Sequence, residues 1–284
     1  MSQRAVAFVT DSTAYLPKDL VEQYAITVVP NVVNWGTKAY RDGVDISSSE
    51  FFERLKTDPV QPTTAVASIG EFRDHYAKAA EAAPHVIGIH LSHKLSGTFS
   101  AAEQARAMLP DKDITVIDSN ATAMALGFVL LAAARAAEAG QPLAEVVAAA
   151  KAAIPRVGLV FTVETLEYLR RGGRIGGAQA FLGGLLDMKP ILELRDGRVE
   201  PVERVRSKKK ALDRVLDIIA EQTAGRGKVH LATIHAAAAA EAAGVLAAAK
   251  ERLNAVEGVM AEASPTVATH TGPGTVGLAY YVEG

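Results

Sequence analysis

The chain has 284 residues, a net charge of −2 at neutral pH and no cysteine. This length is enough for about two domains with a large core. The nearly balanced charge gives no electrostatic reason to expect a nucleic-acid partner, and without cysteine there is no disulfide, thiolate nucleophile or cysteine-ligated zinc. The longest apolar-rich run, residues 121–134, is too short to span a bilayer, and the N-terminus shows no signal peptide. We therefore expect a cytoplasmic protein.

The first half of the chain alternates short β-branched runs with helical stretches. Strands are predicted at residues 5–9, 26–33, 86–91 and 114–117. This alternation is typical of parallel βαβ units and predicts an α/β domain. The S-x-x-E pattern marks two helix starts, at Ser47 with Glu50 and at Ser68 with Glu71, because each side chain satisfies a backbone N–H of the other residue.

The pattern changes after Pro155, so we expect two domains, 1–155 and 156–284. A strand at 157–162 precedes a hairpin whose arms, 191–194 and 199–205, flank the turn pair Asp196-Gly197, a strong hairpin signature. Helices at 208–221 and 237–253 flank a strand at 229–234. The closing segment, 265–282, is predicted to contribute loops and a strand and to reach back toward the first domain.

Hydroxyl residues gather where the predicted strands of the first domain end. Thr10-Asp11-Ser12-Thr13, Leu91-Ser92 and Asp118-Ser119 all stand at such ends, and Ser96-Gly97-Thr98 begins a helix. The carboxyl edge of an open parallel sheet is the usual ligand site, and hydroxyls beside a helix N-terminus attract anions. A shared anion site is therefore predicted; the alternative is that each hydroxyl only caps a helix.

Several familiar catalytic motifs are missing. The chain lacks a phosphate-binding G-x-x-x-x-G-K-[ST] loop, a G-x-S-x-G elbow and an H-E-x-x-H helix. One G-x-G-x-x-G, residues 272–277, lies too near the C-terminus to begin a dinucleotide unit, so its glycines are better explained by a close backbone approach to a ligand. The seven histidines show no metal-ligand spacing, and we expect no metal site. His270 has the hydroxyl and glycine neighbours of a polar loop.

Residues 165–192 combine basic residues, glycine pairs and apolar side chains with few acidic ones. A helix carrying Leu166, Tyr168 and Leu169 is predicted to end at Gly172-Gly173. Paired glycines there are typical of a C-cap; the alternative is a gate beside an apolar cavity. The apolar side chains of this region could line a tunnel or form plain core: Phe161, Leu166, Phe181, Leu182, Leu185, Leu186, Met188 and Ile191.

Five motifs, in order, resemble those of the DegV family of bacterial fatty-acid-binding proteins, and the resemblance covers the whole chain. They are VTDSTA at 9–14, LSHKLSGT at 91–98, VIDS at 116–119, TLEYLRRGGRIGGAQAFLGGLLDMKPIL at 165–192 and HTGPG at 270–274. The resemblance implies an N-terminal α/β domain with a parallel sheet and the head-group site. It also implies a C-terminal α/β domain with a mixed sheet and the tail tunnel, with the ligand between the two.

The resemblance also implies a site. In the family, three residues hold the fatty-acid carboxylate: a threonine, the serine of the L-S-G-T motif and a C-terminal histidine. They correspond here to Thr64, Ser96 and His270. Thr63 competes with Thr64, because TAVASIGEF stands where the family usually has T-S-Q-P-S-x-G-E-F. Further contacts are expected at Gly97, Thr271, Ser12 and Ser119. The chain departs from the family pattern at seven positions: Ala65, Val66, Ala67, His93, Lys94, Ala123 and Ala125.

The family implies a binding subunit without catalysis of its own. It would present a long-chain fatty acid, its only ligand and not a cofactor, to a separate ATP-dependent kinase subunit that forms an acyl phosphate for phospholipid synthesis, with transient contact to a membrane surface. Arg170, Arg174 and Arg206 are gate or partner candidates, together with the lysines at 208–210, whose alternative is a solvated helix start.

Two other functions remain open from the residues. One is a stand-alone phosphotransferase or hydrolase acting on a small anionic metabolite, with Asp11, Asp118 or His270 as acid or base. The other is a regulatory ligand sensor, for which the chain shows no separate effector or DNA-binding module. The preferred acyl chain and the oligomeric state are not predicted.

Overall fold

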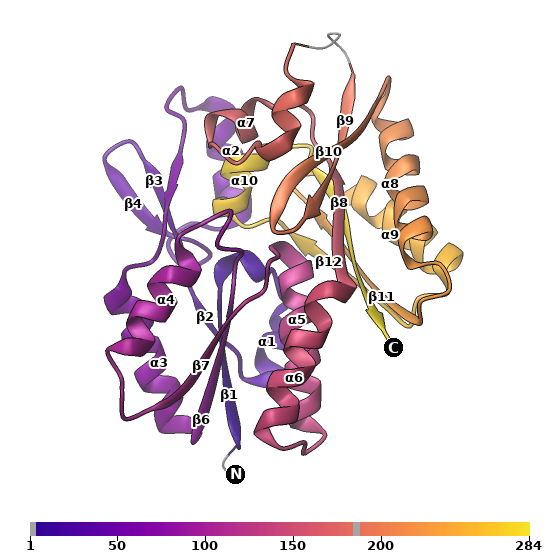
Figure 1. Ribbon diagram of the computed structural model, residues 1–284. Coiled ribbons are helices and arrows are strands. Elements are labelled where there is room, and N and C mark those ends of the chain that lie inside the picture. Colours follow the sequence, from indigo (N-terminus) through magenta and orange to yellow (C-terminus); the bar gives the residue numbers. More distant parts are fainter. Residues whose placement is uncertain (1–3, 184–187) are drawn as a thin grey trace.

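The computed structural model describes residues 4–183 and 188–284. Its N-terminal sheet is parallel, with the strand order β2 (Thr27–Val29), β1 (Val6–Asp11), β6 (His85–His90) and β7 (Asp113–Asp118). Helices α3 (Ile69–Ala82) and α4 (Thr98–Ala107) cover one face, and α5 (Ala123–Glu138) and α6 (Leu143–Ala153) lie on the other (Figure 1). The α/β prediction for this part is confirmed.

The second large sheet is mixed, as predicted. Its order is β10 (Arg198–Val205), β9 (Lys189–Arg195), β8 (Val157–Thr162), β13 (Val276–Glu283), β11 (Lys228–His235) and β12 (Glu257–Glu262). Within this sheet, β11 and β12 pair in parallel, and the other described neighbours pair antiparallel. Helices α8 (Lys208–Thr223) and α9 (Ala239–Leu253) cover its outer face (Figure 1).

A third, small antiparallel sheet begins where one predicted strand breaks. The strand expected at 26–33 is wrong: β2 ends at Val29, Pro30 and Asn31 intervene, and β3 (Val32–Trp35) pairs in another sheet with β4 (Lys38–Arg41) and β5 (Thr63–Ala65). Proline has no N–H to continue a ladder, so the chain leaves the first sheet there. Helices α1 (Lys18–Tyr24) and α2 (Ser48–Thr57) flank this stretch.

The predicted helix starts and the predicted hairpin turn are confirmed, because each depends on residues only a few positions apart. Ser47 with Glu50 and Ser68 with Glu71 both form reciprocal capping boxes. The Asp196-Gly197 turn has positive φ at both residues, 50° and 74°, as a tight hairpin turn requires.

The closing segment was incompletely predicted. Helix α10 (Pro265–Thr271) precedes β13, with Pro265 in the first turn where its missing N–H costs nothing. His270 therefore lies in the last turn of a helix rather than in a polar loop. Strand β13 stands inside the sheet between β8 and β11.

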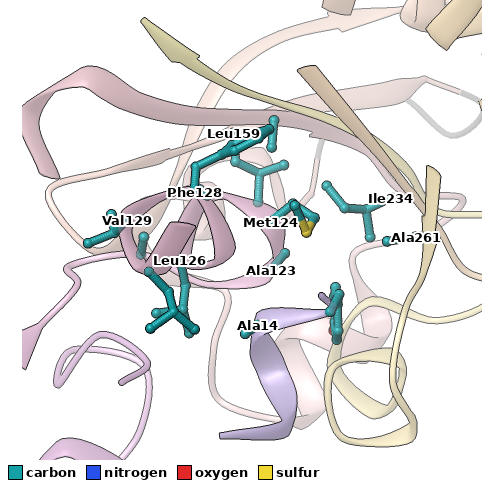
Figure 2. Packing of buried hydrophobic residues seen from close by; sticks show 14 of the residues in the cluster. Ala14, Ala123, Met124, Leu126, Phe128, Val129, Leu159, Ile234 and Ala261 are labelled. Carbon is teal, nitrogen blue, oxygen red and sulfur yellow. The ribbon is translucent and has the colours of Figure 1, made fainter. Parts of the chain in front are cut away.

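Helix α5 joins the two large sheets. It packs against β1 and β6 on one side and against β8, β11 and β13 on the other. Figure 2 shows Met124 and Phe128 of α5 in the apolar cluster that also holds Leu159 of β8 and Ile234 of β11. Such an all-round apolar helix is stable only inside a core. No helix of the described residues is long and apolar enough to cross a membrane.

Candidate ligand-binding site

A cavity lies among the first sheet, the small sheet, α10 and the second sheet. It is open to solvent, and the space between its lining side chains, open solvent at the mouth included, is about 1070 Å³. Apolar side chains from both halves of the chain form much of its wall: Leu91, Leu95, Leu159, Phe161, Leu169, Leu194, Val199, Ile234 and Val267.

Four polar residues of the wall, Thr64, Ser96, Arg174 and His270, form what we term the polar cluster. Thr64 Oγ1 of β5 lies 2.8 Å from His270 Nε2 of α10. The Arg174 Nε donates to the Leu95 carbonyl at 3.0 Å, and its Nη1 donates to the Gly172 carbonyl at 2.6 Å. Leu95 precedes Ser96, and a Cβ on Gly172 would lie 2.0 Å from His270 Nδ1, so Arg174 bonds to the backbone beside Ser96 and beside the His270 ring.

The His270 imidazole is neutral at physiological pH. Burial, helped by the positive charge of Arg174, lowers its pKa from the ordinary 6.5 to about 4. One ring nitrogen therefore donates and the other accepts. In the part of the chain that the structure describes, Nδ1 has no hydrogen-bond partner, so the Thr64 contact is the polar bond that orients the ring.

The two glycines after α7 (Glu167–Arg171) have different roles. Gly173 adopts a left-handed φ of 70° and, with the Arg174 N–H on the Leu169 carbonyl, ends the helix. Gly172 has an ordinary φ, but a Cβ there would come within 2.0 Å of His270 Nδ1. The C-cap prediction thus fits the pair, with Gly172 at the C-cap and Gly173 left-handed after it, and Gly172 also makes room for the histidine.

Ser96 is held by the start of α4. Its Oγ lies 2.9 Å from Thr98 Oγ1 and accepts from the Thr98 N–H at 3.3 Å. The serine therefore faces the cavity at the N-terminus of a helix, where backbone N–H groups favour negative charge.

The other expected contacts are placed differently. Thr271 lines the cavity, but its hydroxyl donates back to the Val267 carbonyl. Gly97 is the N-cap of α4 outside the lining, and Ser12 donates to Asp42. Ser119 is buried and bonds to the His90 carbonyl and the Ala121 N–H.

Thr63 and Thr64 point to opposite faces of β5. The two alternate along β5, so Thr64 lines the cavity while Thr63 is exposed. Successive residues of a strand point to opposite faces. This places Thr64 beside His270.

The predicted tunnel residues contribute less than expected. Of the six described ones, Phe161 lines the cavity, whereas the other five lie off its lining: Leu166, Phe181, Leu182, Met188 and Ile191. Ile191 is buried in the core beneath α8. Leu185 and Leu186 lie outside the described residues. Leu159, Leu194 and Val199 were missed, since only the strand pairing shows which face of β8, β9 and β10 points inward.

The predicted gate or partner residues also differ in whether they line the cavity. Arg174 lines the cavity, Arg170 pairs with Glu167, and Arg206 is exposed. Lys208 is not a solvated helix start, because its Nζ bonds to Glu164 and the Gly274 carbonyl. The other two lysines, Lys209 and Lys210, are exposed.

Of the three acid or base candidates, only His270 lines this cavity. Asp11 is fully buried and accepts from Thr13, Asn31 and Leu91. Asp118 accepts from His93 and the Asn120 N–H. Within the described residues, no three His, Asp or Glu side chains gather as a metal site would require.

Comparison with known proteins identifies the family. A model described as "Uncharacterised protein, DegV family" matches residues 5–283. This chain belongs to the DegV family. A DegV domain-containing protein of Streptomyces coelicolor is 41% identical over 278 residues, which cover 97% of this chain and 98% of the relative. Protein DegV of Bacillus subtilis is 34% identical over 276 residues, covering 97% and 98%.

Solved DegV structures have the same fold. A fatty-acid-binding DegV family protein from Thermus thermophilus superposes with a TM-score of 0.93 at 37% identity, covering 98% of this chain and all of that one. DegV of Bacillus subtilis, described as a fatty acid binding protein, gives a TM-score of 0.90 at 33% identity, covering 99% of this chain and 100% of the other. The predicted fold class and family are therefore confirmed.

Proposed function

We propose that this DegV protein binds a long-chain fatty acid in the cavity, with the carboxylate at the polar cluster and the tail along the apolar wall. The observation that carries the proposal is the combination, in one cavity, of an extensive apolar lining with Thr64, Ser96, Arg174 and His270. Two similar structures described as fatty acid binding support it.

The energetics suit such a ligand. Hydrogen bonds from hydroxyl groups to a carboxylate contribute about 1.5–3 kcal/mol each. A buried tail of about a dozen methylenes adds roughly 10 kcal/mol at about 0.8 kcal/mol per group. The tail therefore sets most of the affinity, and the polar cluster sets the orientation.

We further propose that the protein is a carrier without catalysis of its own. It would present the carboxylate to a separate ATP-dependent kinase subunit that forms an acyl phosphate for phospholipid synthesis. The exposed guanidinium groups of Arg170 and Arg206 are the proposed docking contacts. Arg174, which lines the cavity, would steady the carboxylate instead.

The binding proposal is tested by native mass spectrometry of the purified protein, followed by extraction of bound lipid and thermal unfolding with added palmitic acid. A co-purified fatty acid, or a higher Tm with palmitic acid, is the expected result. A ligand that binds only the folded state at 100 times its Kd stabilises by about 2.7 kcal/mol. If no lipid co-purifies and palmitic acid does not raise the Tm, the binding proposal is wrong.

The head-group position has a matched pair of variants. Thr64→Val removes the hydroxyl beside His270 and should weaken palmitic acid binding about tenfold or more, since a charge-assisted hydrogen bond is lost. Ser96→Ala should do the same. Thr63→Val, on the opposite face of β5, is the control and should leave the affinity unchanged. Equal affinities for Thr64→Val and Thr63→Val would place the carboxylate elsewhere.

A further inference from the structure

A chain of hydrogen bonds runs from the buried carboxylate of Asp11 to Ser96. The Asn31 Nδ2 donates to Asp11 Oδ1 at 3.3 Å and lies 3.4 Å from Ser12 Oγ. The Thr98 hydroxyl donates to Asn31 Oδ1 at 3.4 Å, and Thr98 Oγ1 lies 2.9 Å from Ser96 Oγ. Asn31 and Ser96 line the cavity, and Thr98 is fully buried behind them.

Asp11 fixes the donor and acceptor directions of these hydrogen bonds at their buried end. Burial alone raises the pKa of Asp11, but the hydrogen bond and charge of His90, with donors at Thr13 and Leu91, hold it below its ordinary value. The carboxylate is therefore ionised and can only accept. The Asn31 amide must turn its NH₂ toward Asp11, which leaves Oδ1, an acceptor, facing Thr98.

The hydroxyl proton of Thr98 then has two acceptors within reach, Asn31 Oδ1 and Ser96 Oγ. While it lies on Asn31, the Ser96 hydroxyl donates inward to Thr98. When an anion reaches Ser96, the serine proton can turn outward without loss of the Ser96–Thr98 bond only if the Thr98 proton turns to Ser96 Oγ. The bond given up is the longer one, at 3.4 Å, and the bond at 2.9 Å is kept with its direction reversed.

We propose that Thr98 is a positioning residue that aims the Ser96 hydroxyl at the ligand carboxylate by switching its own proton from Asn31 to Ser96. This inference rests on the proposed fatty-acid site and adds a specificity element to it. A serine that accepts from Thr98 is polarised, and hydrogen bonds in a chain strengthen one another. The gain is largest for a charged acceptor, so the switch favours a free acid over a neutral ester.

The experiment compares palmitic acid with methyl palmitate at pH 8, each displacing a fluorescent long-chain fatty acid. Thr98→Val keeps the shape of the side chain and removes the hydroxyl. It should lower the acid affinity about fivefold, the loss of roughly one hydrogen bond, and the ester affinity less than about twofold. Thr98→Ser keeps the hydroxyl and should restore the wild-type ratio of acid to ester affinity.

A packing defect would lower both affinities together, so an unchanged ratio in Thr98→Val overturns the switch. Thr98→Ala, which removes the hydroxyl without adding a methyl group against the Asn31 amide, replaces the valine variant if circular dichroism shows that valine prevents folding. Wild-type protein that binds neither probe would contradict the proposed function itself. Wild-type binding with an unaltered ratio in the variant contradicts only the role of Thr98.

Discussion

Polar side chains gather in two neighbouring regions of this chain, at the carboxyl ends of the first sheet and around the cavity. At the strand ends, Asp11, Ser92 and Ser119 bond to groups of the protein itself. Around the cavity, Thr64 and Ser96 keep bonding capacity on the face that lines the open space. The first group fastens loops together, and the second faces the cavity, where we propose that the ligand binds.

The difference shows why hydroxyl residues at strand ends are ambiguous in a sequence. Ser92 donates to the Gly197 carbonyl and so clips the β9–β10 turn onto the loop after β6, where Lys94 bonds to the Asp196 carbonyl. Two residues from Lys94, Ser96 faces the cavity. Sequence neighbours of the same kind thus belong to different regions.

The largest expected effect is a pH dependence of stability that comes from His270. Its pKa is about 4 in the folded chain and near 6.5 in the unfolded chain. Between these values only the unfolded chain binds the proton, so stability is full above about pH 6.5 and falls as the pH drops toward 4. The loss reaches at most about 3 kcal/mol, from about 1.36 kcal/mol per pKa unit.

Urea unfolding between pH 4 and 8 measures this loss. Because carboxylates also titrate at the acidic end, the decisive quantity is the difference from His270→Gln, which has no proton to gain. Wild type should lose more stability than the variant across this range. If the free energies of unfolding of wild type and variant fell equally with pH, the imidazole would bind a proton as readily in the folded chain as in the unfolded one.

Next in size is Gly172→Ala. The added methyl would lie 2.0 Å from His270 Nδ1 and 2.8 Å from its Cε1. The ring must move and its contact with Thr64 must loosen, so overpacking costs about 1–3 kcal/mol and palmitic acid binding weakens. Calorimetric titration measures the affinity.

Gly173→Ala is the matched control for this prediction. Its φ of 70° strains alanine, yet no atom lies within 4 Å of the added Cβ. This variant should lose about 1 kcal/mol of stability, the cost of a left-handed alanine, and keep its affinity. If both variants bind alike, the contact between Gly172 and His270 does not shape the polar cluster.

The sequence predicts those features of the fold that depend only on residues close together in the chain. The capping box at Ser68 and the turn at Asp196-Gly197 depend on residues within one turn, and both are present. The place of β13 between β8 and β11 depends on pairing with strands distant in sequence. No local pattern carries that information. The break after β2 is also local, because Pro30 has no N–H to continue the ladder.

The site is less predictable from residues alone. Thr64 and His270 are 206 residues apart, and no spacing rule connects them; the family resemblance brought them together. Asn31 was missed because an asparagine after a proline is typical of an ordinary turn. Arg174 is predicted as a gate or partner residue, and no sequence pattern shows that the end of α7 folds back against Leu95.

The smallest expected effect tests the strand-end region directly. Ser119→Ala removes a hydroxyl that donates to the His90 carbonyl at 2.7 Å and accepts from the Ala121 N–H at 3.1 Å. The buried N–H loses its partner, so unfolding in urea should become easier by about 1–2 kcal/mol. Palmitic acid affinity should stay at the wild-type value, because the hydroxyl lies off the cavity lining. Weaker binding with unchanged stability would instead move Ser119 into the ligand site and extend that site to the end of β7.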